Sequence, residues 1–338
     1  MSEAMKITIK DVAKKAGVGT TTVSRVLNNE KYVSDEKRRL VEKAIRELGY
    51  SPNWIARSLV RKKTNLIGVI VPQVNLSFYS SILTVMEKIA FEHGYSLFIC
   101  ITMHNEQKEF QSVQLCKEMK VEGLILMHEQ LAENTTKFIM DWGISAVSSS
   151  GEIYHTDIPS VLVDDYGASK ELTHYVLEQG HRHLSYIAGS KEPHATLDKR
   201  LSGFLDAIAE AAQPITYEVV HGDYSIQSGY SLMESIISKN SPSTAVIAIS
   251  DDVAIGAMNY LKDIGKKVPE DISVVGFDGS DISEHYRPRL TTIRQPFRIM
   301  GEETIKLIIQ LINGEQTNEK VIVPYQLFIG NSVSQRKG

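Results

Sequence analysis

The sequence predicts a small all-α headpiece joined by a short linker to an α/β core of two doubly wound parallel sheets. Three observations support this fold class. Residues 8–28 read as two short helices around a tight turn. From Asn65 onward, apolar strand-like runs alternate with amphipathic helical segments in two successive series. At 338 residues, with 42% apolar and 23% charged residues, the chain has room for two or three globular domains.

The first helix is expected to begin at Thr8. Thr8 and Asp11 have the spacing of a capping box, in which each side chain bonds the amide of the other residue. Gly17 supplies a residue that can take a positive φ in the following turn, and Val18 offers an apolar side chain between the helices. The second helix is therefore expected to begin near Thr20.

The second helix has one apolar and one polar face. Val23, Val26 and Leu27 recur at helical spacing and are expected to face inward. The outward positions carry hydroxyls, an amide and a guanidinium, namely Thr20, Thr21, Thr22, Ser24, Arg25 and Asn28. These donors and acceptors suit the base edges in the major groove of DNA. A well-capped, solvated helix is the alternative, and the spacing of the whole two-helix stretch favours DNA binding.

A third helix is expected between a cap at Ser34 and a stop at Gly49, with acidic residues in its first turn. Its apolar stripe consists of Leu40, Val41, Ala44, Ile45 and Leu48. Residues 1–63 contain 15 Lys and Arg against 7 Asp and Glu, a net charge of +8, whereas residues 64–338 have 22 against 34, or −12. This asymmetry indicates a polyanion-binding head on an acidic body.

A family resemblance rests on two nearby stretches, TIKDVAKKAGVGTTTVSRVLNN and VSDEKRRLVEKAIRELGYSPNWIARSL. They resemble the headpiece and hinge of the LacI/GalR family of bacterial transcriptional regulators, and the resemblance extends through nearly all 338 residues. The resemblance implies a homodimer that binds a palindromic operator and whose affinity for the operator changes when a small molecule enters the core. The resemblance also implies that the headpiece contacts bases through Thr20, Thr21, Ser24 and Arg25. Thr22 and Asn28 would lie nearer the phosphates. Thr8, at the start of the first helix, would also contact DNA.

Residues 51–63 connect the predicted headpiece, residues 1–50, to the core. Pro52 ends whatever precedes it and Asn53 can cap a following turn, yet so short a segment does not form a stable isolated helix. The resemblance implies a hinge helix that folds only when two chains meet on DNA. Asn53 would contact DNA, Ala56 would lie at the close helix contact and Leu59 would wedge into the minor groove. An ordinary linker with one exposed Leu is the alternative.

The core, residues 64–338, contains two series of strand-like runs. The first consists of LIGVIV, YSLFICI, VEGLILM and ISAVSS, and the second of HLSYIAG, YEVVHG, TAVIAIS and ISVVGFD. Such continuous apolar strands indicate parallel sheets covered on both faces, which bind ligands beyond the carboxyl ends of their strands. The resemblance adds a periplasmic-binding-protein-like architecture with crossovers near Val163, Ile293 and Pro324. It implies two subdomains, of about 64–162 with 294–323 and about 163–293 with 324–338.

Residues at these strand ends match the effector pocket of the family, namely Phe78, Tyr79, Ser150, Arg200, Tyr224, Ser250, Asp278 and Gln295. A guanidinium, a carboxylate and aromatic faces suit a polyhydroxylated or planar ligand. Structural roles are the alternatives: Ser250 can cap the next helix, Asp278 can hold a loop amide, and the aromatics can pack in a core or dimer seam. The family commonly has Asn at the position of Ser250 and often Asp at that of Ser150. A sugar is the expected effector class.

Other classes of protein find less support in the sequence. Asp251 and Asp252 are adjacent and diverge on a helix, and no nucleophile-base pair or metal-ligand pattern is apparent, so we expect neither an enzyme nor a cofactor. Cys100 and Cys116 are expected to be reduced, buried thiols. Without a membrane span or export signal we expect a cytoplasmic protein, and without a heptad run after the helix at 297–312 a dimer. Two alternatives remain: control by a phosphorylated carrier protein, and a sugar-binding protein without a DNA role.

Overall fold

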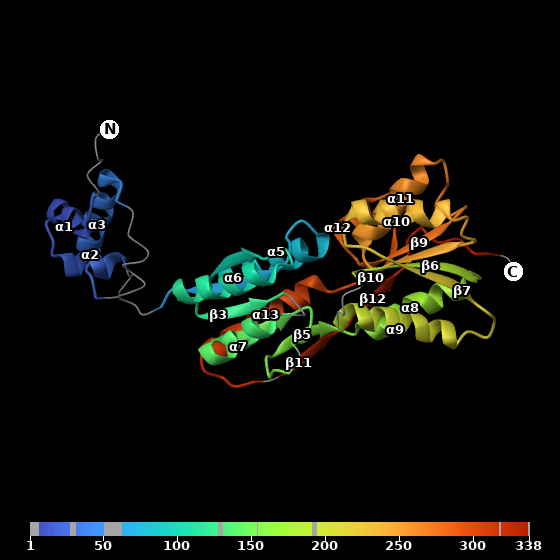
Figure 1. Ribbon diagram of the computed structural model, residues 1–338. Helices are drawn as coiled ribbons and strands as arrows, with labels where there is room; N and C mark the ends of the chain where they lie inside the picture. Colours follow the sequence, from blue (N-terminus) through green and yellow to red (C-terminus); the bar gives the residue numbers. More distant parts are fainter. Residues whose placement is uncertain are drawn as a thin grey trace. The chain divides into compact units, whose positions relative to one another are not determined.

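The computed structural model describes residues 7–27, 32–50, 63–127, 131–153, 155–190, 195–317 and 319–336 (Figure 1). The chain forms two compact units, Met1–Thr64 and Asn65–Gly338, which are called the headpiece and the core below. Four residues predicted to contact DNA lie outside the described residues: Asn28, Asn53, Ala56 and Leu59.

The headpiece consists of α1 (Ile9–Ala16), α2 (Thr20–Leu27) and α3 (Asp35–Leu48) around one apolar cluster. The predicted interaction at the start of α1 is present, since Oδ2 of Asp11 accepts from the amide of Thr8 at 2.8 Å and from its hydroxyl at 2.7 Å. α1 ends at Gly17 with φ 65° and α3 at Gly49 with φ 61°, the positive values for which glycine is suited. The buried side chains are Val12, Ala13, Ala16, Val23, Val26, Val41 and Ala44.

Two details of the predicted third helix are wrong. Ser34 occupies the N-cap position of α3, but its side chain makes no cap hydrogen bond within the described part of the headpiece. Leu40 is 44% exposed instead of belonging to the apolar stripe. At 3.6 residues per turn, Leu40 lies about a quarter turn from the centre of the stripe that Val41, Ala44, Ile45 and Leu48 form. The cluster thus closes without it.

The first lobe of the core is built on a six-stranded, wholly parallel sheet in the order β11-β5-β4-β3-β1-β2. Its strands are β1 (Leu66–Val71), β2 (Ser96–Ile101), β3 (Gly123–Leu126), β4 (Ser145–Ser149), β5 (Ser160–Val163) and β11 (Lys320–Val323). Its helices are α5 (Ser77–Glu92), α6 (Glu106–Glu118), α7 (Glu133–Trp142) and α13 (Phe297–Ile312).

The second lobe is built on a second six-stranded sheet in the order β12-β10-β9-β8-β6-β7, in which only the β10–β12 pair is antiparallel. Its strands are β6 (His183–Ala188), β7 (Thr216–His221), β8 (Ala245–Ala248), β9 (Ser273–Asp278), β10 (Thr291–Arg294) and β12 (Gln326–Phe328). Its helices are α8 (Asp165–Glu178), α9 (Ala195–Ala209), α10 (Ile226–Ser238), α11 (Asp251–Asp263) and α12 (Asp281–His285).

The predicted fold class is confirmed, and each of the eight predicted strand-like runs contains a strand. The runs correspond to β1–β4 in the first lobe and β6–β9 in the second. Four short strands were not predicted: β5, β10, β11 and β12. They lie where the chain passes from one sheet to the other, which it does after β5, after β10 and after β11.

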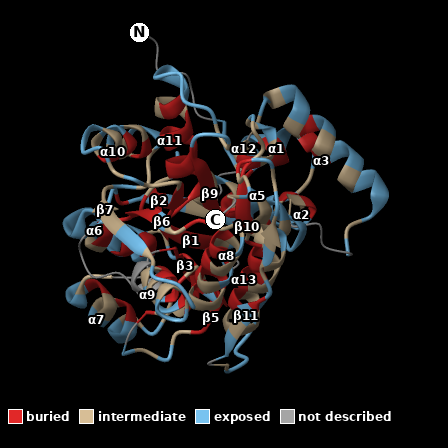
Figure 2. Ribbon diagram, turned by 90° about the vertical axis from the view of Figure 1, so that its right-hand side faces the viewer, coloured by how far each residue is buried: buried red, intermediate tan, exposed pale blue. Residues whose placement is uncertain are grey.

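Burial follows the sheets. Buried residues run along the strands, and the outward faces of the helices carry exposed residues (Figure 2). Strands β1, β3, β8 and β9 are buried almost throughout, as expected for parallel strands covered on both faces. Cys100 and Cys116 are both buried and free, so the expected burial of the two thiols is confirmed. Within the described residues, none of the helices combines the length and apolarity needed to cross a bilayer.

His181 lies in the loop between α8 and β6, and His183 begins β6. The His181 ring is fully buried, with Nδ1 2.9 Å from the hydroxyl of Thr244 and Nε2 3.1 Å from the carbonyl oxygen of Ser334. Burial lowers the pKa of His181 to about 4, even though the bond to Ser334 acts in the opposite direction. The ring is therefore neutral in the folded core at neutral pH.

We expect His181 to lower the stability of the core as the pH falls. The unfolded residue binds a proton near pH 6.5 and the folded one only near pH 4, so stability is lost as the pH falls through this window. The loss between pH 7 and pH 5 is about 2 kcal/mol. Burial raises the pKa of Asp251 to about 6, which works the other way over part of the same range.

The measurement is therefore a difference between wild type and His181→Gln in urea unfolding at pH 7 and pH 5. We expect the stability advantage of wild type to shrink by about 2 kcal/mol at the lower pH, because only His181 differs between the two proteins. An advantage of equal size at both pH values would contradict a neutral, buried ring.

Candidate functional site

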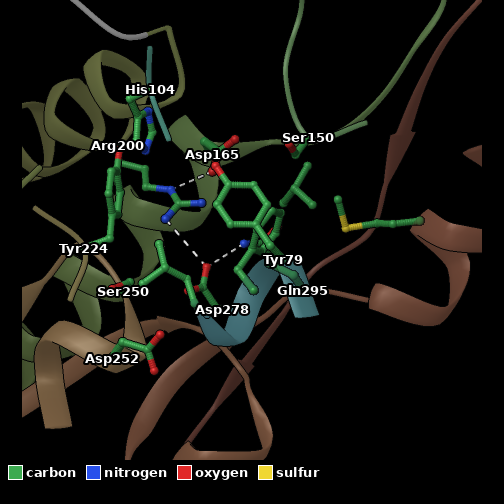
Figure 3. A pocket seen from close by; sticks show the side chains of 14 residues that line it. Tyr79, His104, Ser150, Asp165, Arg200, Tyr224, Ser250, Asp252, Asp278 and Gln295 are labelled. Atoms are coloured by element: carbon green, nitrogen blue, oxygen red, sulfur yellow. Dashed lines mark hydrogen bonds and ion pairs between the residues drawn. The ribbon is translucent and has the colours of Figure 1, made fainter. Parts of the chain in front are cut away.

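A cavity lies between the two lobes of the core, at the carboxyl ends of their strands (Figure 3). The structure brings together all eight residues that the sequence assigned to one pocket. The space between the lining side chains, including its opening to solvent, is about 720 Å³. Small-molecule pockets in proteins enclose roughly 300 to 1,000 Å³. The eight residues are Phe78, Tyr79, Ser150, Arg200, Tyr224, Ser250, Asp278 and Gln295.

Arg200, on α9, is the centre of a buried ion cluster. Its Nε lies 2.7 Å from Oδ1 of Asp165, and its Nη1 lies 2.8 Å from the carbonyl oxygen of Ile249 and 3.7 Å from Oδ1 of Asp278. Its guanidinium carbon lies 3.7 Å from the centroid of the Phe277 ring. Burial alone would lower the pKa of Arg200, but the carboxylates of Asp165 and Asp278 raise it above its ordinary value. One face of this guanidinium and two of its three nitrogens, Nε and Nη1, thus contact other groups of the protein.

Asp278 ends β9 and connects the ion cluster to Gln295. Its Oδ1 accepts a hydrogen bond of 2.8 Å from Nε2 of Gln295, and it is 5% exposed. Burial raises the pKa of Asp278 well above its ordinary value, although Arg200 acts to lower it. The amide of Ser280, in the loop after Asp278, donates to Oδ2 of Asp251 at 2.7 Å. Asp278 therefore faces the cavity and not the following loop.

Two lining residues adopt backbone conformations that are uncommon outside glycine. Ser150, directly after β4, has φ 91°, and Asp278 has φ 125°. Left-handed conformations of this kind cost free energy and concentrate at functional sites. Ser250 has an ordinary backbone and caps α11, since its hydroxyl accepts from the amide of Val253 at 3.3 Å. The structural role anticipated for Ser250 is thus real, and Ser250 also lines the cavity.

The aromatic residues combine packing with exposure to the cavity. Phe78 packs against the core of the first lobe. The centroid of its ring lies 5.3 Å from that of the Tyr79 ring and 5.7 Å from that of the Phe297 ring. Tyr224 comes from the second lobe and packs against its core. In the view of Figure 3, the rings of Tyr79 and Tyr224 lie on either side of the Arg200 guanidinium. The cavity therefore has aromatic walls around a polar centre.

Several lining residues were missed by the sequence interpretation. Asp165 directly follows the crossover from β5, and Asp252 lies on α11 beside Asp251. The two neighbouring carboxylates diverge as expected, because Asp251 bonds Ser280 while Asp252 bonds Ser77. Asp165 was missed because the short strand before it, β5, was not predicted. A search for polar residues after every strand would have found it. The other residues missed are Leu76, His104, Val163 and Met300.

The headpiece presents the polar face predicted for α2. Thr20, Thr21 and Arg25 are exposed, and Thr22 and Ser24 are half-buried. Thr8, at the start of α1, is also exposed. The apolar face of α2 packs into the headpiece cluster, so the polar face can vary without disturbing the core. Over the described part of the chain, no three His, Cys, Asp or Glu side chains come together as metal ligands.

A helix-turn-helix headpiece attached to a two-lobed core with a ligand cavity defines the class of ligand-responsive DNA-binding regulators. Residues 8–53 match the family described as "Bacterial regulatory proteins, lacI family". Residues 64–331 match "Periplasmic binding proteins and sugar binding domain of LacI family". The chain belongs to the LacI family of bacterial regulatory proteins, and it is a DNA-binding transcriptional regulator with an effector-binding core.

Individual relatives agree with this assignment. The chain is 34% identical to the HTH-type transcriptional repressor PurR of Pasteurella multocida, over 97% of this chain and 99% of that protein. It is 29% identical to catabolite control protein A of Priestia megaterium, over 96% and 98%. The crystal structure of the lac repressor dimer bound to operator and the anti-inducer ONPF superposes with a TM-score of 0.85, at 28% identity over 98% of this chain and 100% of that one.

Proposed function

We propose that this regulator represses transcription as a homodimer on a palindromic operator, and that an uncharged, polyhydroxylated small molecule controls its affinity for that operator. A sugar is the class of effector that fits best. The observation that carries the proposal is the set of charged groups lining the cavity, in which three acidic side chains accompany a single guanidinium whose Nε and Nη1 already bond protein acceptors.

The polar groups of the cavity favour hydroxyls over anions. Asp165, Asp252 and Asp278 line it together with Arg200, whose hydrogen bonds go to protein acceptors. A phosphate or carboxylate would face these three acids and would have to compete with Asp165 and Asp278 for Arg200. A hydroxyl can donate to a carboxylate and accept from an amide such as that of Gln295, while a sugar ring can pack on an aromatic face. An uncharged sugar meets both requirements.

The DNA role follows from the headpiece and the family. The polar face of α2, with Arg25 exposed on it, supplies the donors that base edges accept. We infer that the predicted DNA contacts and the eight cavity residues carry these two functions, and that no catalytic step is involved, since the related proteins are transcriptional regulators. We place the protein in the cytoplasm because its operator would be there.

The test begins with selection of an operator from a random duplex library by the full-length protein. Operator affinity is then measured by fluorescence anisotropy with neutral sugars, sugar phosphates and nucleobases, and separately with a phosphorylated carrier protein. We expect one neutral sugar to change the affinity by roughly 5- to 150-fold, the usual size of an allosteric coupling. A sugar phosphate that binds more tightly than its parent sugar would contradict the charge argument. If the phosphorylated carrier protein changed operator affinity and none of the small molecules did, the cavity would not be the regulatory site.

The edge of the first sheet supports the homodimer. β2 is an edge strand, and Ile99 and Ile101 on it are 44% and 42% exposed. Phe91, at the end of α5, is 73% exposed. Exposed edge strands with large apolar side chains favour association and are usually covered in native proteins. We propose that this edge is covered by the same edge of a second chain.

We expect Ile101→Asp to weaken dimerisation by at least about 100-fold, because two carboxylates would be buried across the symmetric seam. Sedimentation equilibrium at micromolar concentration measures the change, and operator affinity should fall with it. Ile322→Asp is the matched control, since Ile322 is 66% exposed on β11 at the opposite edge of the same sheet. Equal effects of both substitutions would place the seam elsewhere.

A further inference from the structure

Helix α5 begins without a cap of its own. Its N-cap residue is Leu76, whose side chain has no acceptor, and it forms no cap hydrogen bond within the described core. The amides of a helical first turn need acceptors from outside the helix, and the end of the dipole there attracts negative charge. The first residue of α5, Ser77, therefore depends on another part of the chain for an acceptor.

That acceptor comes from the other lobe. Oδ2 of Asp252 accepts the backbone amide of Ser77 at 2.9 Å, and Oδ1 accepts its hydroxyl at 2.7 Å. Ser77 belongs to the first lobe and Asp252 to α11 of the second, 175 residues away. The Asp252 side chain is held in place because α11 is anchored by its own cap at Ser250. One carboxylate thus bridges the two lobes through both of its oxygens.

The contact is sensitive to the distance between the lobes. Asp252 is 7% exposed, and the hydrogen bonds that its carboxylate accepts among the described residues come from Ser77. Charge-assisted hydrogen bonds of this kind are roughly twice as strong as neutral ones and require donor-acceptor distances below about 3 Å. Because both bonds join the same two residues, a rotation that separates Ser77 from Asp252 would break them together and leave the start of α5 uncapped.

We propose that Ser77 and Asp252 form an interlobe latch, which holds the effector cleft closed and sets the balance between its closed and open forms. This inference rests on the proposed function, because the cleft it regulates is the effector site. A ligand shifts such a balance only by its differential affinity for the two forms. The latch contributes to the free-energy difference between the closed and open forms. This difference sets how strongly the effector must prefer one form, and therefore sets both effector affinity and the size of the operator response.

The position of Ser77 allows the latch to be separated from direct ligand contact. Asp252 lines the cavity, so a change there can act on the ligand itself, whereas the lining residues next to Ser77 are Leu76 and Phe78. Ser77→Ala removes the hydroxyl donor. Ser77→Pro removes hydroxyl and amide together without breaking α5, since proline is well tolerated at the first position of a helix. Asp252→Asn removes the charge at constant size.

Small-angle X-ray scattering of the full-length protein without effector tests closure directly. We expect Ser77→Pro and Asp252→Asn to give a larger radius of gyration than wild type, and Ser77→Ala an intermediate one. Ser80→Ala is the matched control, because its hydroxyl bonds the carbonyl oxygens of Leu76 and Ser77 within its own end of α5. Scattering curves identical to wild type for all variants would overturn the latch. This measurement needs no effector, so it remains decisive if the proposed function is wrong.

Effector titration supplies the second readout. We expect Ser77→Pro to lower effector affinity about tenfold, and the Ser77→Pro, Asp252→Asn double variant to lose no more than Asp252→Asn alone, because both substitutions break the same contact. Saturating effector should return each variant to the wild-type radius of gyration. Additive losses of affinity would show that the two residues act independently and would overturn the proposal.

Discussion

Replacing Arg200 by Met is expected to abolish the response to the effector and to lower the free energy of unfolding by about 3 to 5 kcal/mol. Asp165 and Asp278 would be left buried without the cation that both approach, and the carbonyl of Ile249 would lose its donor. Met fills much of the volume over the Phe277 ring, so the loss reports the missing charge more than a cavity. Urea unfolding measures the stability, and operator anisotropy with and without effector measures the response.

Two further variants make this result interpretable. Asp165→Asn combined with Arg200→Met removes one of the unpaired charges, so part of the stability should return while the response stays absent. Arg298→Met is the matched control, since Arg298 is exposed and its pair with Glu302 on the surface of α13 is worth at most about 1 kcal/mol. A stable Arg200→Met protein that still responds to effector would remove Arg200 from the site.

Much of the fold was predictable because its signals are local. Eight strands were predicted from apolar runs in the sequence. Gly17 and Gly49 were predicted to end helices, and both have the positive φ that favours glycine. The strands that escaped prediction, β5, β10, β11 and β12, have three or four residues each. β3 and β8 are equally short but lie within the longer runs VEGLILM and TAVIAIS. The four missed strands have no such run around them, and they form because a neighbouring strand in the sheet supplies the hydrogen bonds.

The cavity was predictable to the extent that strand ends are predictable. Ser150 follows β4 and Asp278 closes β9, so the rule for parallel sheets places each at the carboxyl edge of its own sheet, where ligands bind. The partners of these residues were not predictable, because they are set by the packing of distant segments. Asp165 is 35 residues from Arg200, and Asp252 is 175 residues from Ser77. Nothing in the local sequence distinguishes either acid from an ordinary residue of a first helical turn.

The crossovers explain how ligand contacts could be coupled to movement of the lobes. Asp165 begins α8 immediately after the chain leaves β5, and Gln295 follows β10 immediately before the chain returns to the first lobe. Both bond the ion cluster, Asp165 through Arg200 and Gln295 through Asp278. Rotation of one lobe against the other therefore changes the geometry of the groups that line the cavity. The coupling is reciprocal, so operator binding must alter effector affinity by the same factor.

Replacing Arg25 by Ala is expected to weaken binding to the matched operator by about 2 to 6 kcal/mol, since a homodimer presents this residue twice and a bidentate base contact is worth about 1 to 3 kcal/mol. Arg25 is exposed on α2, whose packing depends on Val23 and Val26, so the headpiece should stay folded. Competition between matched and mismatched duplexes measures the effect. Preference should fall at one base pair in each half-site and persist at the others.

Lys62→Ala provides the contrast. Lys62 belongs to the basic run at residues 61–63 that follows the predicted hinge, it lies outside the described residues, and we expect it to contact phosphate. A lysine that contacts phosphate supplies affinity without information, so its loss should weaken all duplexes alike and reduce the slope of log affinity against log salt by about 1 per chain. Arg25→Ala should leave most of that slope and change the ranking of duplexes. If both substitutions weakened every duplex equally, Arg25 would be a second phosphate contact. Base recognition would then have to come from Thr20, Thr21 and Ser24, the other residues of α2 predicted to contact bases.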